Sequence, residues 1–348
     1  MSRVVVALGG NALIRRGQEG STAVQRRNLL GAARALADLV RLGHELVLTH
    51  GNGPQVGFLA IEADAARDTV PPPPLDVLVA ESQGQIGYLL AQALSAQFAM
   101  EGRRRSVAVV LSQTIVDPAD PAFLLPSKPV GPMYDRRTAE AMVREHGWTI
   151  APDGSSWRRV VASPRPREIV EAASIRTLVD AGVIVIASGG GGIPVVRLAS
   201  GALAGVEAVI DKDYAAVVLA EAVGADALLL LTDVDAVYRS WGAPEQSRLR
   251  RLTPAAIKTW VRDGTFAARS MGLKVGGRDP ATRSSGGRDP FGASRATNRA
   301  YPRPRRLNPG RDGPLRAYHL DRLARRNGPA ALADSGLVAY GRFVVSPF

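Results

Sequence analysis

Short apolar runs that end in segments rich in glycine and asparagine recur along the chain. Residues 4–8 lead into Gly9-Gly10-Asn11, and residues 45–49 lead into His50-Gly51-Asn52-Gly53. Runs of this length, rich in valine and leucine and without polar alternation, are typical of strands buried on both faces of a sheet. The same reasoning predicts further strands over residues 107–111, 183–187 and 225–231.

Segments with apolar residues at helical spacing separate these strands. They predict a helix over residues 21–42, ended by Gly43, and further helices through residues 83–90, over 168–181 and from 211 to 219. Because strand–helix–strand units close with a right-handed parallel crossover, the glycine-rich loops are expected at the carboxyl edge of one parallel sheet. Ligands of α/β proteins bind at that edge. Residues 117–164, rich in proline, are predicted to form an inserted lobe that projects from the sheet.

Glycines directly after a buried strand let backbone N–H groups approach a phosphate or a carboxylate. For Gly9-Gly10 alone an ordinary turn is the simpler explanation, but the second loop at residues 51–53 favours an anion site. A third loop, residues 188–192, contains four consecutive glycines. Such a run is unfavourable unless the backbone must pass close to something.

Composition narrows the functional classes. The chain has no cysteine, which excludes a thiolate nucleophile, a disulfide framework and a cysteine-ligated metal. The net charge of +12 is concentrated in the arginine-rich residues 276–348, so the body gives no reason to expect nucleic acid. The longest apolar runs are too short to span a bilayer, and the amino-terminal run is not followed by a cleavage site. These features predict a cytoplasmic protein without a membrane partner.

Lysine is rare, and its positions are informative. Only Lys128, Lys212, Lys258 and Lys274 accompany the many arginines of the chain. Lys258 is attributed to chance. The other three stand in motifs, and a lysine ammonium is a compact, mobile partner for phosphate. The alternatives are a solvated surface lysine at 128 and a simple helix cap at Asp211.

A series of motifs in this order resembles carbamate kinase, within the amino-acid kinase family. In sequence order they are VVALGGNAL, HGNGPQVG, SKPVGP, the segment from Trp157 to Pro164, GGGGIPVV, GVEAVIDKD, TDVDAVY and SMGLK. The resemblance covers residues 1–275. The SKPVGP insert and the tryptophan-containing segment distinguish carbamate kinase from acetylglutamate and uridylate kinases.

The resemblance implies a three-layer α/β/α sandwich with a mostly parallel central sheet of about eight strands. It implies a carbamate lobe over about residues 1–182, with the insert at about 117–164, and a nucleotide lobe over about 183–275. The implied reaction is reversible phosphoryl transfer between ATP and carbamate to give ADP and carbamoyl phosphate, running toward ATP in arginine catabolism. Magnesium would be held mainly by the phosphates, and the family is typically a cytoplasmic homodimer.

Site residues follow from the same resemblance. The residues expected to line the substrate and phosphate pocket are Gly9, Gly10, Asn11, Gly51, Asn52 and Gly53. Lys128 would reach in from the lobe, Lys212 and Lys274 would stabilise the transferring group, and Asp211 would orient lysine. Those expected around the nucleotide are Gly190, Gly191, Gly192, Ile193, Asp233, Asp235, Tyr238 and Met271. No carboxylate set is expected to form a dedicated metal site.

The resemblance stops at Val275. Residues 276–348 are rich in glycine, proline, serine and arginine, and they are expected to be largely disordered apart from a short helix near 315–326. The abrupt change is interpreted as a frameshift, with a natural extension as the alternative. The loss of a helix and two strands is expected to leave one edge of the sheet uncovered.

Other functions remain open at this stage. One is another amino-acid kinase that acts on a different small carboxylate. A second is a homologue, inactive because of its altered carboxyl terminus, that retains the fold for binding or regulation. A third is nucleic-acid binding by the arginine-rich tail, where Phe291, Tyr301 and Tyr318 are too sparse for a stacking platform.

Overall fold

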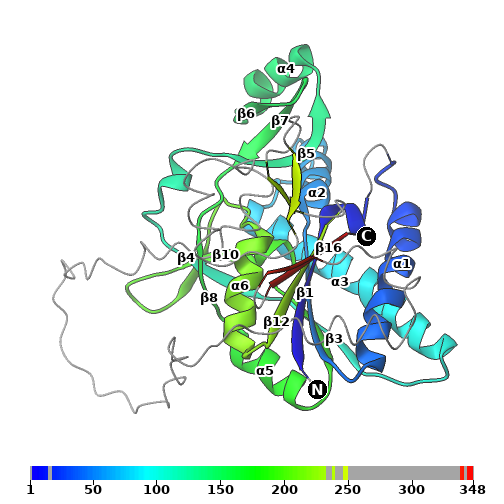
Figure 1. Ribbon diagram of the computed structural model, residues 1–348. Coiled ribbons are helices and arrows are strands. Elements are labelled where there is room, and N and C mark those ends of the chain that lie inside the picture. The colour runs from blue at the N-terminus through cyan, green and yellow to red at the C-terminus, as the bar shows by residue number, and fades with distance from the viewer. Residues whose placement is uncertain are drawn as a thin grey trace.

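A central seven-stranded sheet organises the described part of the chain, in the order β15-β16-β12-β1-β2-β9-β3 (Figure 1). The computed structural model describes residues 2–14, 18–232, 237–239, 246–249, 338–340 and 343–347. The strands are β1 (Arg3–Leu8), β2 (Glu45–His50), β3 (Val107–Val110), β9 (Ile184–Ala187), β12 (Ala227–Thr232), β15 (Val338–Tyr340) and β16 (Phe343–Pro347). Neighbouring strands are parallel except β15 and β16. The predicted α/β class with a mostly parallel sheet is confirmed.

The central strands β1, β2, β9 and β12 of this sheet are buried on both faces, as their valine- and leucine-rich sequences predict. The helices α1 (Thr22–Arg41) and α3 (Leu75–Met100) cover one face, and α5 (Ala172–Asp180) and α6 (Lys212–Val223) cover the other (Figure 1). Because side chains alternate along a strand, β1 supplies both cores: Leu8 packs under α1 and α3, and Val5 under α5 and α6. The result is the expected three-layer arrangement.

A second sheet of four strands differs from the prediction. Its order is β11-β10-β4-β8, with bounds β4 (Gln113–Val116), β8 (Pro166–Ile169), β10 (Ile193–Arg197) and β11 (Leu203–Gly205). The helix predicted from residue 168 was therefore wrong at its start. Antiparallel pairing of β8 with the distant β4 determines these residues, and this pairing leaves no helical or alternating signature in so short a segment.

The segment predicted as an irregular lobe contains regular structure and projects from the body (top of Figure 1). It holds β5 (Lys128–Tyr134), α4 (Arg136–His146), β6 (Ile150–Asp153) and β7 (Ser156–Val161), and the strands pair antiparallel in the order β5-β7-β6. Asp135 caps α4 by accepting the Thr138 N–H at 2.7 Å, and Gly147 ends the helix at φ +65°. We call residues 128–161 the projecting lobe.

Two strands cover the sheet edge that was expected to be open. β16 pairs in parallel with β12, placing Leu228 opposite Phe343, and β15 pairs antiparallel with β16. The expectation that the tail contributes no strand to this edge was wrong, because β15 and β16 form an antiparallel pair and β16 is hydrogen-bonded to β12. Residues 315–326 lie outside the described residues. A short hairpin, β13 (Val237–Arg239) and β14 (Ser247–Leu249), completes the assigned strands.

None of the helices in the described residues is both long enough and apolar enough to cross a bilayer.

Candidate active site

Three glycine loops lie at the carboxyl ends of neighbouring strands in the central sheet. They follow β1, β2 and β9, whose parallel pairing brings their carboxyl ends to one edge. A methyl group placed on Gly51 would lie 3.3 Å from Cδ of Lys212 and 3.6 Å from the backbone N of Gly10. The first two loops and the start of α6 therefore meet, as the sequence predicted for the edge of a parallel sheet.

Two lysine–aspartate pairs stand at the amino terminus of α6. Lys128 Nζ donates to Asp211 Oδ2, and Lys212 Nζ lies 2.5 Å from Asp213 Oδ1. Asp211 also caps the helix, because its Oδ1 accepts the Asp213 N–H at 2.9 Å. Lys128 comes from the first residue of β5, so the projecting lobe and the body contribute one ammonium each.

Three of these four charged side chains are largely buried, which affects the pKa of Asp211. The side chains of Asp211, Lys212 and Asp213 are 10%, 11% and 8% exposed, whereas that of Lys128 is 25% exposed. Burial raises the pKa of Asp211, but the adjacent Lys128 ammonium and, to a lesser extent, Lys212 lower it below its ordinary value. Asp211 is thus a carboxylate at neutral pH, and the ion pairs hold both ammonium groups beside the glycine loops.

The third loop passes against the second. Gly190 adopts φ +66°, and a methyl group there would lie 2.2 Å from Asn52 Nδ2; Gly191 adopts φ +95°, and its methyl would lie 2.6 Å from the carbonyl oxygen of Ile210. Gly192 has φ +89°. The glycine run is therefore required by positive φ and by close packing against protein atoms next to Asp211. A role in nucleotide binding is a separate proposal.

Other predicted residues lie around the same edge. The Gly9 N–H donates to the Leu231 carbonyl at 3.2 Å. Gly53 is the first residue of α2 (Gly53–Ala65), and a methyl group placed on it would lie 4.0 Å from the carbonyl oxygen of Pro129, the residue after Lys128. Ile193 begins β10 directly after the third loop.

Several predicted residues are described only in part or not at all. Asn11 lies in the short helix η1 (Gly10–Ala12), and Tyr238 lies in β13; only their backbones are described. Asp233, Asp235, Met271 and Lys274 lie outside the described residues.

Buried polar side chains form a layer next to the loops that was not predicted from the sequence. Asn52 Nδ2 donates to Ser82 Oγ at 2.9 Å, and Thr49 Oγ1 donates to the Ser188 carbonyl at 2.8 Å. Ser188 has φ +52°, in the left-handed region that residues other than glycine rarely adopt. Burial lowers the pKa of His50 to about 4, so its ring is neutral at pH 7. Serine and threonine at strand ends and in a helix interior carry no pattern that would have predicted this layer.

A dedicated site for a divalent metal would need several carboxylate or imidazole groups close together. Among the residues that the structure describes, no group of three or more histidine, aspartate or glutamate side chains is arranged to hold a metal ion. Asp211 and Asp213 each contact a lysine. Both carboxylates at the start of α6 are therefore already engaged by ammonium groups.

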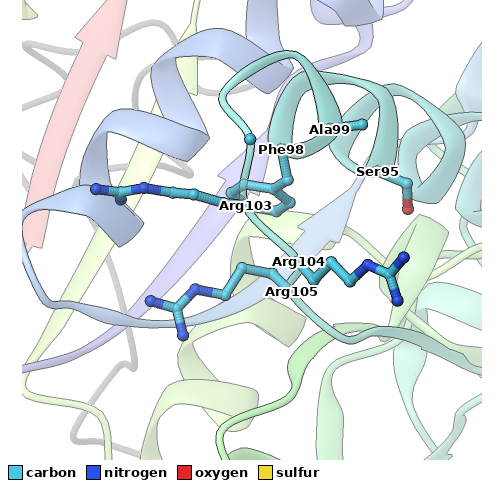
Figure 2. A pocket seen from close by; sticks show the side chains of 7 residues that line it. Ser95, Phe98, Ala99, Arg103, Arg104 and Arg105 are labelled. Carbon is cyan, nitrogen blue, oxygen red and sulfur yellow. The ribbon is translucent and has the colours of Figure 1, made fainter.

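A cavity of about 530 Å³ lies at the opposite end of the sheet, between the end of α3 and the start of β3. Phe98 and the consecutive Arg103, Arg104 and Arg105 help to line it (Figure 2). The three guanidinium groups end well apart in Figure 2 and do not converge on one point. We therefore place the candidate active site at the glycine loops and not in this cavity.

Comparison with known proteins gives a consistent result. The family model described as the amino acid kinase family matches residues 2–277. A carbamate kinase of Pyrococcus furiosus is 49% identical over 276 residues, which cover 78% of this chain and 88% of the relative; one of Escherichia coli is 49% identical over 287 residues, covering 82% and 92%. A structure of carbamate kinase from Giardia lamblia bound to citric acid has a TM-score of 0.75 at 41% identity, covering 79% of this chain and 87% of that one. The chain thus belongs to the amino acid kinase family.

Proposed function

We propose that this chain is a carbamate kinase, which transfers a phosphoryl group reversibly between ATP and carbamate. The observation that carries the proposal is the convergence of Lys128 and Lys212, each on an aspartate, beside three glycine loops at one sheet edge. The similarity to named carbamate kinases supports the same reaction. A carbamate kinase of Giardia lamblia has also been solved with AMP-PNP, an ATP analogue, at 42% identity to this chain.

The chemistry needs charge neutralisation and alignment more than proton transfer. Carbamate already carries an anionic oxygen, so no general base is required to make it a nucleophile. In the ATP-forming direction, an oxygen of the ADP β-phosphate attacks the phosphorus of carbamoyl phosphate, and the bond to the carbamate oxygen breaks. Cations and backbone N–H groups that surround the phosphoryl group are the main source of rate in such reactions.

Lys128 and Lys212 are proposed to supply those cations. Their aspartate partners hold them near the loops without a ligand, and phosphoryl oxygens then share or replace these contacts. Asn11, Lys274 and the backbone N–H groups of the loops at Gly9-Gly10 and Gly51–Gly53 are assigned to the same group by resemblance. Nucleotide contacts are assigned, by resemblance, to Gly190, Gly191, Gly192, Ile193, Asp233, Asp235, Tyr238 and Met271.

Magnesium, bound to the nucleotide phosphates, would neutralise part of their charge. We propose further that the enzyme works in the cytoplasm as a homodimer and forms ATP during arginine catabolism. Exposed apolar side chains on edge strand β3 and nearby elements support self-association: Val109 is 38% exposed, Leu111 51% and Tyr88 52%. Light scattering after size-exclusion chromatography tests the dimer.

An assay of ATP formation from ADP and carbamoyl phosphate tests the reaction. Wild-type protein should turn over, and Lys212→Ala should lower kcat by about 10²–10³-fold, as does the loss of a group that stabilises developing charge. Lys258→Ala, which changes a lysine outside every motif, is the matched control. A panel of small carboxylates with ATP separates carbamate from other acceptors. Absence of turnover by folded, monodisperse wild-type protein contradicts the proposal.

A further inference from the structure

Arg165 is an exposed cation held rigidly beside the candidate active site. It stands between Pro164 and Pro166, in the segment that joins β7 to β8. Proline fixes its own φ and restricts the residue before it, so the backbone of Arg165 has little freedom. Its N–H donates to Asp120 Oδ2 at 2.9 Å, which ties it to the cap of the short helix η2 (Pro121–Phe123).

The side chain of Arg165 lies on an aromatic ring at the start of α6. Its Cζ is 3.6 Å from the ring centroid of Tyr214, two residues after Lys212. Tyr214 follows Asp213 directly in the chain, and burial raises the pKa of its hydroxyl, which the Arg165 guanidinium lowers and the nearby Asp211 and Asp213 carboxylates raise further. The pair therefore borders the two lysine–aspartate pairs described above.

Arg165 differs from two nearby arginines in its ion pairing. In the described part of the chain it forms no ion pair with a carboxylate, whereas Arg167 pairs with Asp117 and Arg158 with Asp153. A planar guanidinium that is fixed on a ring and lacks a counter-ion is pre-organised for an anion with several oxygens.

We propose that Arg165, positioned by Tyr214, is an additional substrate-binding residue that contacts the phosphate group of carbamoyl phosphate. This inference rests on the proposed function, and it names a contact that the motifs of the chain did not indicate. We expect this contact to lower KM for carbamoyl phosphate more than it raises kcat. The reason is that Arg165 is not one of the two lysines proposed to neutralise the phosphoryl group during its transfer.

Steady-state kinetics of Arg165→Gln against Arg167→Gln tests the contact. Both substitutions remove one exposed arginine charge, from positions two residues apart. Arg165→Gln should raise KM for carbamoyl phosphate by about tenfold or more, the loss expected for a charge-assisted hydrogen bond, with kcat changed by less than about twofold. Arg167→Gln should leave both constants unchanged. Equal KM values in the two variants overturn the proposal.

Three further variants separate charge from positioning. Arg165→Lys keeps the charge without the planar fork and should raise KM by about threefold. Tyr214→Leu removes the stacking surface and should raise KM in the same way as Arg165→Gln, while Tyr214→Phe keeps the ring and should raise it less. Equal effects of Leu and Phe at position 214 contradict the positioning role. Thermal unfolding of each variant checks that the fold is intact.

A binding measurement keeps this inference distinct from the proposed reaction. Phosphonoacetamide is an analogue of carbamoyl phosphate in which a CH₂ group replaces the bridging oxygen. It keeps the amide and a phosphonate in place of the phosphate, but its P–C bond does not break, so no phosphoryl group is transferred. Calorimetric titration should show about tenfold weaker binding to Arg165→Gln than to wild type, and unchanged binding to Arg167→Gln. Inactive wild-type protein that still shows this difference contradicts the proposed function alone. No binding by wild type, or equal binding by Arg165→Gln, overturns the role of Arg165.

Discussion

The ion pair between Lys128 and Asp211 joins the projecting lobe to α6, and Asp211→Asn measures its strength. Asparagine keeps an oxygen that can accept the Asp213 N–H, a bond of 2.9 Å in the structure, and it caps helices about as well as aspartate. The substitution therefore removes the charge and leaves the cap.

The expected loss follows from the exposure of the two partners. The side chain of Asp211 is 10% exposed, and that of Lys128 is 25% exposed. Breaking a fully buried pair costs about 3–5 kcal/mol, whereas an exposed pair contributes about 0–1 kcal/mol. Because the ammonium still reaches water, we expect the free energy of unfolding to fall by about 1–2 kcal/mol at pH 7. That corresponds to a decrease in Tm of about 2–8 °C for a domain of this size.

The difference should depend on pH in one direction. The pKa of Asp211 is lowered in the folded protein, because the nearby lysines outweigh the effect of burial, which raises it. Stabilisation is therefore complete above the unfolded carboxyl pKa of about 3.9, and it is lost as the pH falls through the lower folded value. Wild type and variant should differ by a constant amount from about pH 8 to about pH 5 and converge below about pH 4.

Urea unfolding monitored by tryptophan fluorescence gives these free energies, since Trp148 and Trp157 lie in the projecting lobe. A double-mutant cycle with Lys128→Met should give a coupling energy of about 1 kcal/mol. Zero coupling, or an Asp211→Asn protein as stable as wild type at pH 7, refutes the conclusion that this pair fastens the lobe. A difference that grows as the pH falls refutes the assigned sign.

Three glycine substitutions test the packing of the fold, two at close contacts and one at an open position. A methyl group on Gly57 would lie 1.9 Å from Cα of Gly131 in the lobe, so Gly57→Ala should lower the free energy of unfolding by about 2 kcal/mol. Gly31→Ala, at an exposed position of α1 with open space around it, should instead raise the free energy of unfolding by up to about 1 kcal/mol. Urea unfolding that ranks Gly57→Ala above Gly31→Ala contradicts the packing. Gly190→Ala places its methyl 2.2 Å from Asn52 at φ +66° and should cost about 1–3 kcal/mol. Adding Asn52→Ala should recover part of that loss, and no recovery means that strain in φ is the whole cause.

The sequence was sufficient to predict the middle of the central sheet because β1, β2, β9 and β12 are buried on both faces. Each of the runs at residues 4–8, 45–49, 107–111, 183–187 and 225–231 corresponds to a parallel strand. The prediction was wrong where pairing is non-local: β8 was taken for the start of a helix, and β15 and β16 were not expected at all. In the lobe, the prolines masked the sequence pattern of short strands, and β5 pairs with β7 more than 20 residues further along the chain.

The candidate site was predictable in its residue types and not in its pairings. Glycine loops and rare lysines indicated the sheet edge and the charges. Asp211 was expected to orient a lysine, but its partner, Lys128, lies in a different element, and sequence spacing carries no information on that contact. Asp213 and the Arg165–Tyr214 stack depend likewise on tertiary approach.

Lys128 belongs to the projecting lobe and Lys212 to α6. The counter-ion of Lys128, Asp211, stands at the start of α6, so this ion pair connects the two parts of the fold. An anion that draws Lys128 away from Asp211 replaces an internal partner with an external one, and in doing so loosens the attachment of the lobe to α6. Binding of an anion and attachment of the lobe to α6 are therefore thermodynamically linked. Salt concentration should change the apparent affinity for an anion twice, once by screening the ligand and once by weakening the contact that competes with it.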